Sequence, residues 1–270
     1  MKCTFIKLKM IKFAQAIRLY RHALLSQLQV HIKTTIVNTR LGPLWLILDP
    51  LVLMLIYTFV IKVIFERGGP GYHIFILCGI VTWQTFTRSL TICTKSMRAN
   101  ASLILQIALP LQMYVLIPCI VQSFFYMIGL LMIACLNFSI AGMQTLWILL
   151  LPLPMLLFPF ALGLFFAVFE VQLPDIGKFL PYALRIGFYL SPVLYSPEKI
   201  NSLEKMPETL KSIYMLNPML HLITAARDIL FTGATLNFKV YTILIVTSLI
   251  LVQAGLLFFR GHAHKIPKVL

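Results

Sequence analysis

Acidic side chains are scarce in this sequence: Asp and Glu number 8 among 270 residues, against 23 Lys and Arg. All charged residues together make up 11 % of the chain, whereas a soluble domain carries about 25 %. Cysteine is rare as well, and the 5 cysteines include no C-x-x-C pair, so neither a disulfide framework nor a metal site is indicated. These scarcities argue against a soluble domain and leave few groups for acid–base or metal chemistry.

The sequence also lacks the motifs of hydrolases and of nucleotide-binding proteins. None of the patterns H-E-x-x-H, G-x-S-x-G and G-x-x-x-x-G-K-[ST] occurs. We therefore expect the chain not to be an enzyme and to bind no cofactor itself. If it moves a solute against a gradient, the energy must come from a partner subunit or from an ion gradient.

Apolar residues are what the sequence has in abundance. They make up 60 % of the chain, and the mean hydropathy is +0.91. A helix needs about 20 apolar residues to cross a hydrocarbon core of about 30 Å. The fifth apolar stretch is short and interrupted by Pro181, Arg185, Gly187 and Pro192, so we expect a broken helix there. The sequence thus predicts an all-α, polytopic membrane protein with six transmembrane helices, at 44–65, 74–94, 115–136, 146–169, 179–195 and 240–259.

Basic residues cluster at both ends of the chain. The first 43 residues contain no acid and several Lys and Arg, and Arg260, Lys265 and Lys268 follow the last stretch. Because cytoplasmic loops collect Lys and Arg, we expect both termini in the cytoplasm and the protein in the inner membrane. Residues 1–43 would precede a single transmembrane domain at 44–270. Residues 1–20 mix apolar and basic side chains, which predicts an amphipathic helix on the membrane surface; a basic tail is the alternative.

Ionisable groups inside the apolar stretches are few. Carriers driven by ion gradients usually keep such groups near the membrane midplane, and the candidates are Asp49, Lys62 and Arg88. Asp49 and Lys62 lie near opposite ends of the first stretch, where both can reach an interface. Arg88 lies deeper, and we expect it to pair with a carbonyl or a neighbouring helix; a proton or ion relay is the alternative.

Short motifs occur in one order along nearly the whole chain: Arg40-Leu41-Gly42-Pro43-Leu44-Trp45 with Asp49-Pro50 and Tyr57, Gly79-Ile80-Val81-Thr82-Trp83 with Phe86, Leu109-Pro110, Ala161-Leu162-Gly163, Phe188-Tyr189-Leu190-Ser191-Pro192-Val193-Leu194-Tyr195, Asn217-Pro218 and Arg227. In that order they resemble the permease subunits of polysaccharide ABC exporters. This type-2 family exports O-antigen, capsule and teichoic-acid polymers. Two positions depart from the family pattern: Pro174 precedes Asp175 where an arginine-aspartate pair is usual, and Lys33-Thr34-Thr35 replaces an arginine-tyrosine.

The resemblance implies a homodimer of permeases above two copies of a separate P-loop ATPase, which would hold the ATP and Mg. Such an ABC transporter would move a lipid-linked polysaccharide from the cytoplasmic leaflet outward. The alternatives are an ABC exporter of a drug or small lipid and a membrane scaffold that transports nothing. The resemblance also favours short re-entrant helices before the last span, within 196–239, where composition alone allows a surface helix.

Three sets of residues are candidates for the transport machinery. Aromatic faces suit a sliding sugar chain because they contact the apolar faces of sugar rings; anchoring at the membrane interface or packing in the bundle is the alternative for each. The candidates for lining the channel are Trp45, Tyr57, Phe75, Trp83 and Phe86.

The cytoplasmic segment 95–113 is the candidate coupling helix that contacts the ATPase, with Pro110 as its stop before the third span. An ordinary interfacial loop is the alternative. Its candidate contact residues are Arg98, Asn100, Leu103, Ile104 and Gln106. Finally, Arg18, Arg21, Lys33 and Arg40 are candidates for an entrance that pairs with the pyrophosphate of a lipid carrier, although the positive-inside rule explains the same charges.

Overall fold

The computed structural model describes residues 19–37, 42, 44–106, 109–137, 142–201, 207–264 and 266–269. These residues form helices joined by short connections, with no strand among them, so the predicted all-α class is confirmed for this part of the chain. The helices are α2 (Arg21–Val37), α3 (Leu44–Thr58), the π-helix η1 (Phe59–Ile64), α4 (Tyr72–Ala99), α5 (Ala101–Gln106), α6 (Leu111–Leu136), the 3-10 helix η3 (Met143–Leu150), α7 (Pro152–Gln172), α8 (Asp175–Leu190), α9 (Glu198–Asn201), α10 (Glu208–Met215), α11 (Pro218–Leu230), α12 (Phe238–His262) and α13 (Ile266–Val269).

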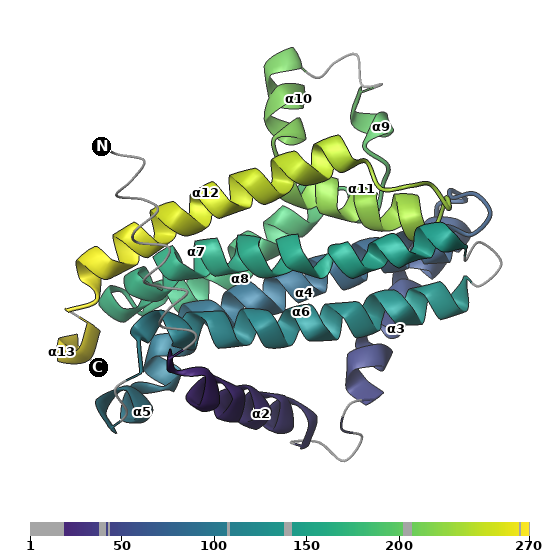
Figure 1. Ribbon diagram of the computed structural model, residues 1–270. Helices are drawn as coiled ribbons and strands as arrows, with labels where there is room; N and C mark the ends of the chain where they lie inside the picture. The colour runs from purple at the N-terminus through teal and green to yellow at the C-terminus, as the bar shows by residue number, and fades with distance from the viewer. Residues whose placement is uncertain are drawn as a thin grey trace.

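The body of the molecule is a helical bundle with α4 at its centre. Helices α4, α6, α7 and α8 run side by side, α12 packs along α7, and α2 packs along α6 (Figure 1). Helices α5 and α13 meet at one end of the bundle, and α11 lies toward the other end. The bundle therefore has two distinct ends joined by long parallel or antiparallel helices.

Four helical segments in the described part of the chain are long and apolar enough to cross a membrane: Leu44–Ile64, Leu111–Leu136, Met143–Gln172 and Phe238–His262. They contain 21, 26, 30 and 25 residues, at or above the roughly 20 that a crossing needs. They correspond to the first, third, fourth and sixth predicted stretches. The chain is thus a multi-pass membrane protein, and the second and fifth stretches need separate treatment.

The second stretch lies in α4, a helix of 28 residues that is enclosed by protein rather than by lipid. Its surroundings explain why it is less apolar than the four spans. Thr82, Thr85 and Thr94 each donate the hydroxyl to the carbonyl four residues earlier at 2.8 Å, which satisfies the hydroxyl within the helix. The Thr82 hydroxyl also lies 3.1 Å from the Tyr126 hydroxyl of α6. A central helix can therefore carry polar side chains that a lipid-facing one would exclude.

The fifth stretch lies partly in α8, which has only 16 residues and so extends about 24 Å. The helix continues through Pro181 and ends at Leu190, two residues before Pro192. Short helices α9, α10 and α11 follow before α12 begins. The expected interruption is thus found at the end of the stretch rather than inside it.

A buried arginine fastens the turn after α8 to the rest of the bundle. Arg227 of α11 is 4 % exposed, and its guanidinium donates to the carbonyl oxygens of Phe75, Pro192, Val193 and Tyr195 at 3.1, 2.6, 2.6 and 3.3 Å. It also lies 3.5 Å from the centroid of the Phe75 ring, a cation–π geometry. Carbonyls of α4 and of the turn after α8 thus share one cation.

At the N-terminal side, Leu24 anchors α2 in a buried apolar cluster that also contains residues of α6. The amphipathic surface helix predicted for 1–20 lies almost wholly outside the described residues. Residue 43, the last before the predicted transmembrane domain, lies outside them as well.

Candidate functional site

An open groove runs between α3, α4 and α8, with a cavity volume of about 410 Å³. Each helix contributes residues at helical spacing: positions 80, 83, 84, 87 and 88 form one face of α4, and positions 181, 184, 185, 188 and 189 form one face of α8. Residues three and four apart lie on the same side of a helix, so two facing stripes make the walls. The lining residues are Leu53, Tyr57, Ile80, Trp83, Gln84, Thr87, Arg88, Pro181, Leu184, Arg185, Phe188 and Tyr189.

Aromatic rings form one continuous surface in this groove. The ring centroids of Tyr57 and Phe188 are 5.7 Å apart, those of Trp83 and Phe188 are 6.3 Å apart, and those of Phe188 and Tyr189 are 5.1 Å apart. These are ordinary separations for interacting rings. Beside the rings, Gln84, Thr87 and two arginines supply hydrogen-bond donors. The groove therefore offers apolar ring faces and polar donors together.

The five aromatic residues predicted to line a channel have different places in the structure. Tyr57 and Trp83 line the groove. Phe86 is buried, and its ring stacks on Phe158 at 5.5 Å. Phe75 lies beneath Arg227, and Trp45 is 44 % exposed near the start of α3, outside the groove. Channel lining remains a prediction for all five, with groove geometry behind the first two.

Sequence reasoning did not assign a role to several groove residues, notably Gln84, Arg185, Phe188 and Tyr189. A signal for them was present, because Pro181, Leu184, Arg185, Phe188 and Tyr189 repeat at helical spacing. The proline and arginine in this stretch also interrupt an apolar run, a pattern that predicts a broken span rather than one polar face of a helix.

Arg88 pairs with Asp49 across α3 and α4, and Nη2 to Oδ2 measures 2.7 Å. Both side chains are partly accessible. This matches the expected pairing of Arg88 with a neighbouring helix. The pair connects the first membrane span to the central helix beside the groove.

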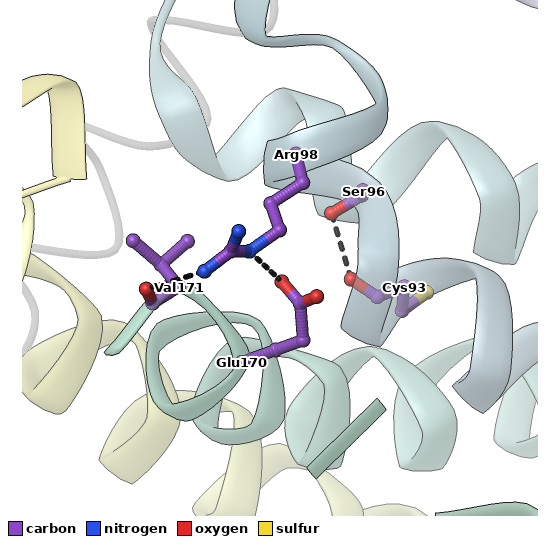
Figure 2. A network of polar contacts seen from close by, with 5 residues as sticks. All are labelled: Cys93, Ser96, Arg98, Glu170 and Val171. Carbon is purple, nitrogen blue, oxygen red and sulfur yellow. Dashed lines mark hydrogen bonds and ion pairs between the residues drawn. The ribbon is translucent and has the colours of Figure 1, made fainter. Parts of the chain in front are cut away.

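At the end of the bundle that carries α5, Arg98 connects α4 to α7 (Figure 2). Its Nε lies 3.3 Å from Oε2 of Glu170, and its Nη2 donates to the carbonyl of Val171 at 3.0 Å. In the same view, the Ser96 hydroxyl donates to the Cys93 carbonyl at 2.7 Å. Because Glu170 is only 5 % exposed, its carboxylate needs charge compensation, which Arg98 supplies as ion-pair partner and Lys95 supplies from nearby.

The other residues predicted for coupling divide into inward and outward groups. The Asn100 amide donates to the carbonyl of Ser96 at 2.7 Å and so caps α4. Leu103 and Ile104 pack partly against the apolar core, whereas Gln106 is exposed. Leu105, which sequence reasoning did not single out, is 65 % exposed and gives α5 an outward apolar side chain.

The predicted phosphate entrance is described only in part. Arg21 and Lys33 are exposed on α2, but they lie twelve residues apart, about 18 Å along a helix, so these two do not converge on one phosphate. Arg18 and Arg40 lie outside the described residues. Within the described residues, no group of three or more His, Cys, Asp and Glu is placed to hold a metal ion.

Comparison with known proteins gives the family. Residues 24–231 match the family described as ABC-2 type transporter. The chain is 27 % identical over 237 residues to an O-antigen export system permease protein, RfbA, of Klebsiella pneumoniae, covering 86 % of this chain and 89 % of that protein. A protein of the same description from Myxococcus xanthus is 24 % identical over 260 residues, covering 95 % and 98 %.

A third relative is the polysialic acid transport protein KpsM of Escherichia coli, 24 % identical over 219 residues, covering 75 % of this chain and 78 % of that protein. The family resemblance inferred from the short motifs is thereby confirmed. Since the match spans α2 to α11, it includes all three walls of the groove and the Arg98–Glu170 pair. The chain belongs to the ABC-2 type transporter family and is a transmembrane permease, a transport subunit with no catalytic role of its own.

Proposed function

We propose that this permease exports a lipid-linked polysaccharide across the cytoplasmic membrane, as a homodimer driven by two copies of a separate P-loop ATPase. The observation that carries the proposal is the groove between α3, α4 and α8, where stacked rings lie beside hydrogen-bond donors. Ring faces bind sugars without strict register, and donors at the side follow the hydroxyl groups. The similarity to O-antigen and polysialic acid transport proteins supports the same cargo class.

The proposal requires six membrane crossings, with α4 and α8 added to the four apolar spans. Helix α4, with 28 residues, extends about 42 Å and is long enough to cross. Helix α8 is short, and the turn that follows it together with α11 would complete its path as a re-entrant segment. Backbone in that position is tolerated when protein satisfies it, and Arg227 does so for the carbonyls of Pro192, Val193 and Tyr195.

With an even number of crossings both termini lie on one side, which the basic terminal segments assign to the cytoplasm. The end of the bundle with α5 and α13 would then face the ATPase. Motion of α5 would reach α7 through Arg98 and Glu170, and would reach the groove through α4. In this arrangement Arg18, Arg21, Lys33 and Arg40 would lie on the side from which the lipid carrier enters.

The experiment is deletion of the gene and complementation with variants, with surface polysaccharide and the co-purifying proteins as the two readouts. We expect deletion to abolish one surface polymer and the purified permease to carry a stoichiometric P-loop ATPase. Tyr57→Ala should reduce export at least several-fold without lowering the amount of complex, whereas Phe124→Ala, which removes an exposed ring on α6, should not.

Trp83→Ala tests the buried side of the groove. Slower export with the complex intact supports contact with the cargo, whereas loss of the complex assigns this ring, 7 % exposed, to packing. Unchanged surface polymer together with altered drug or lipid efflux would contradict the proposed cargo.

A further inference from the structure

Two arginines of the groove lie at the same depth in the bundle. Arg88 precedes Arg98 by ten residues on α4, and Arg185 follows Asp175 by ten residues on α8, a rise of about 15 Å in each case. The end of α4 near Arg98 adjoins the end of α8 near Asp175, because a Cβ on Gly177 would lie 3.5 Å from both Glu170 Cγ and Lys95 Cε. Both guanidinium groups therefore leave their helices about 15 Å from that end of the bundle, a distance equal to half of a hydrocarbon core of about 30 Å.

The groove contains positive charge in excess. Arg88 and Arg185 line it, and no carboxylate is among its lining residues. Asp49 pairs with Arg88 from outside the lining, while Arg185 is exposed and makes no ion pair within the described part of the chain. A charged side chain at this depth is costly unless it faces a partner or a water-filled cavity. The uncompensated cation points to a ligand of opposite charge.

We propose that the groove binds a glycan that carries carboxylate groups, with Arg185 as the main contact and Arg88 as the second. This inference rests on the proposed function and narrows its cargo to an acidic polysaccharide. A guanidinium binds a carboxylate through two parallel hydrogen bonds, and Tyr57, Phe188 and Tyr189 lie beside it to receive the sugar rings. Phospholipid headgroups are a poorer occupant, because they lie at the interface and not at mid-depth.

The test compares two probes on the full-length permease, purified with its ATPase into nanodiscs of phosphatidylcholine. An oligogalacturonate carries one carboxylate per sugar, and a maltooligosaccharide of equal length carries none. We expect the wild type to bind the acidic probe about tenfold more tightly, a difference of about 1.4 kcal/mol. Arg185→Gln should bring the ratio near one, and Arg185→Lys should keep part of it. Arg67→Gln, which removes an exposed arginine of the loop after η1, should leave it unchanged.

A second variant keeps every cation and adds an acid. Gln84→Glu places a carboxylate in the groove, and it should lower the affinity for the acidic probe without changing that for the neutral one. If Arg185→Gln does not fold, Gln84→Glu still tests whether the groove binds a glycan that carries carboxylates.

Four outcomes would overturn the inference. Equal wild-type binding of the two probes would leave a glycan exporter in place without charge selection. An unchanged ratio of the two affinities in Arg185→Gln or Gln84→Glu would show that the groove arginines do not recognise the carboxylates of the glycan. Loss of the acidic probe when phosphatidylglycerol replaces part of the nanodisc lipid would assign the groove to lipid headgroups. Binding of neither probe would also overturn it, while the proposed function would still be judged separately by loss of surface polymer on deletion.

Discussion

Arg227 and Arg98, toward opposite ends of the bundle, stabilise the fold in different ways. Arg227 is satisfied by backbone carbonyls and one ring, so it fixes a turn. Arg98 is satisfied by a buried carboxylate and one carbonyl, so it fixes the ends of two helices. Neither role could be predicted from the sequence, because each depends on which distant segment the guanidinium meets in the folded chain.

The Arg98–Glu170 pair gives the first prediction. Arg98→Gln leaves the Glu170 carboxylate without its ion pair, although Lys95 stays nearby. We expect a loss of roughly 1–3 kcal/mol, measured as a lower temperature of thermal denaturation in detergent. The double variant Arg98→Gln with Glu170→Gln should recover most of the loss, since no buried charge remains. The matched control is Lys178→Gln, which breaks an exposed pair with Asp175 and should change stability by less than about 0.5 kcal/mol. Equal effects in both single variants would contradict the structural role of the buried pair.

Gly79 gives the second prediction, because the chain approaches it too closely for any side chain. A Cβ at this position would lie 2.6 Å from the carbonyl oxygen of Val193 and 2.9 Å from Nη2 of Arg227. Gly79→Ala must therefore displace the turn after α8, at a cost of about 1–3 kcal/mol, visible as reduced folded yield and earlier denaturation. Gly261→Ala on α12 meets nothing within 4 Å and should be neutral or slightly stabilising. Equal stability of the two variants would show that the turn gives way at no cost.

At the scale of helices, apolar length identified the four candidate membrane spans, whereas α4 and α8, which contain most of the second and fifth predicted stretches, are not among them. The rule that a span must be apolar assumes contact with lipid, whereas α4 is surrounded by α3, α6, α7, α8 and α11. Helix α8 presents two faces: the groove residues form one, and exposed Phe179, Tyr182, Ile186 and Leu190 form another. A hydropathy window averages these faces, so the groove is invisible to it even though the helical spacing is present in the sequence.

Helix α5 carries the third prediction, which concerns coupling to the ATPase. Since Leu103 and Ile104 pack inward, the outward Leu105 is the apolar side chain available to a partner. Leu105→Asp should reduce the ATPase that co-purifies with the permease about tenfold, while the permease itself remains folded. Leu216→Asp, at an equally accessible leucine between α10 and α11, should have no such effect. If both variants retain the same amount of ATPase, α5 is not the coupling element.

For the whole molecule, the number of crossings decides on which side each loop lies. The positive-inside rule predicts that both termini lie in the cytoplasm. The side on which the internal loops lie depends on whether α4 and α8 cross the membrane. With six crossings, Gly69 and Met143 lie outside, and Leu105 and His264 lie inside. With only the four apolar spans, Leu105 and Met143 exchange sides, whereas Gly69 and His264 stay where they were. Two positions therefore separate the two topologies, and two serve as internal controls.

The fourth prediction uses that difference. Single cysteines at these four positions, in a variant without native cysteines, are treated with a membrane-impermeant maleimide before and after permeabilisation. All four sites are accessible: Met143 is 83 % and Leu105 65 % exposed, a Cβ on Gly69 meets nothing within 4 Å, and His264 is exposed. We expect labelling of intact cells at Gly69→Cys and Met143→Cys, and labelling of Leu105→Cys and His264→Cys only after permeabilisation. The reverse result at Leu105 and Met143 would leave α4 and α8 on the membrane surface. The groove would then lose its path across the bilayer, so the same experiment tests the topology and the transport route that depends on it.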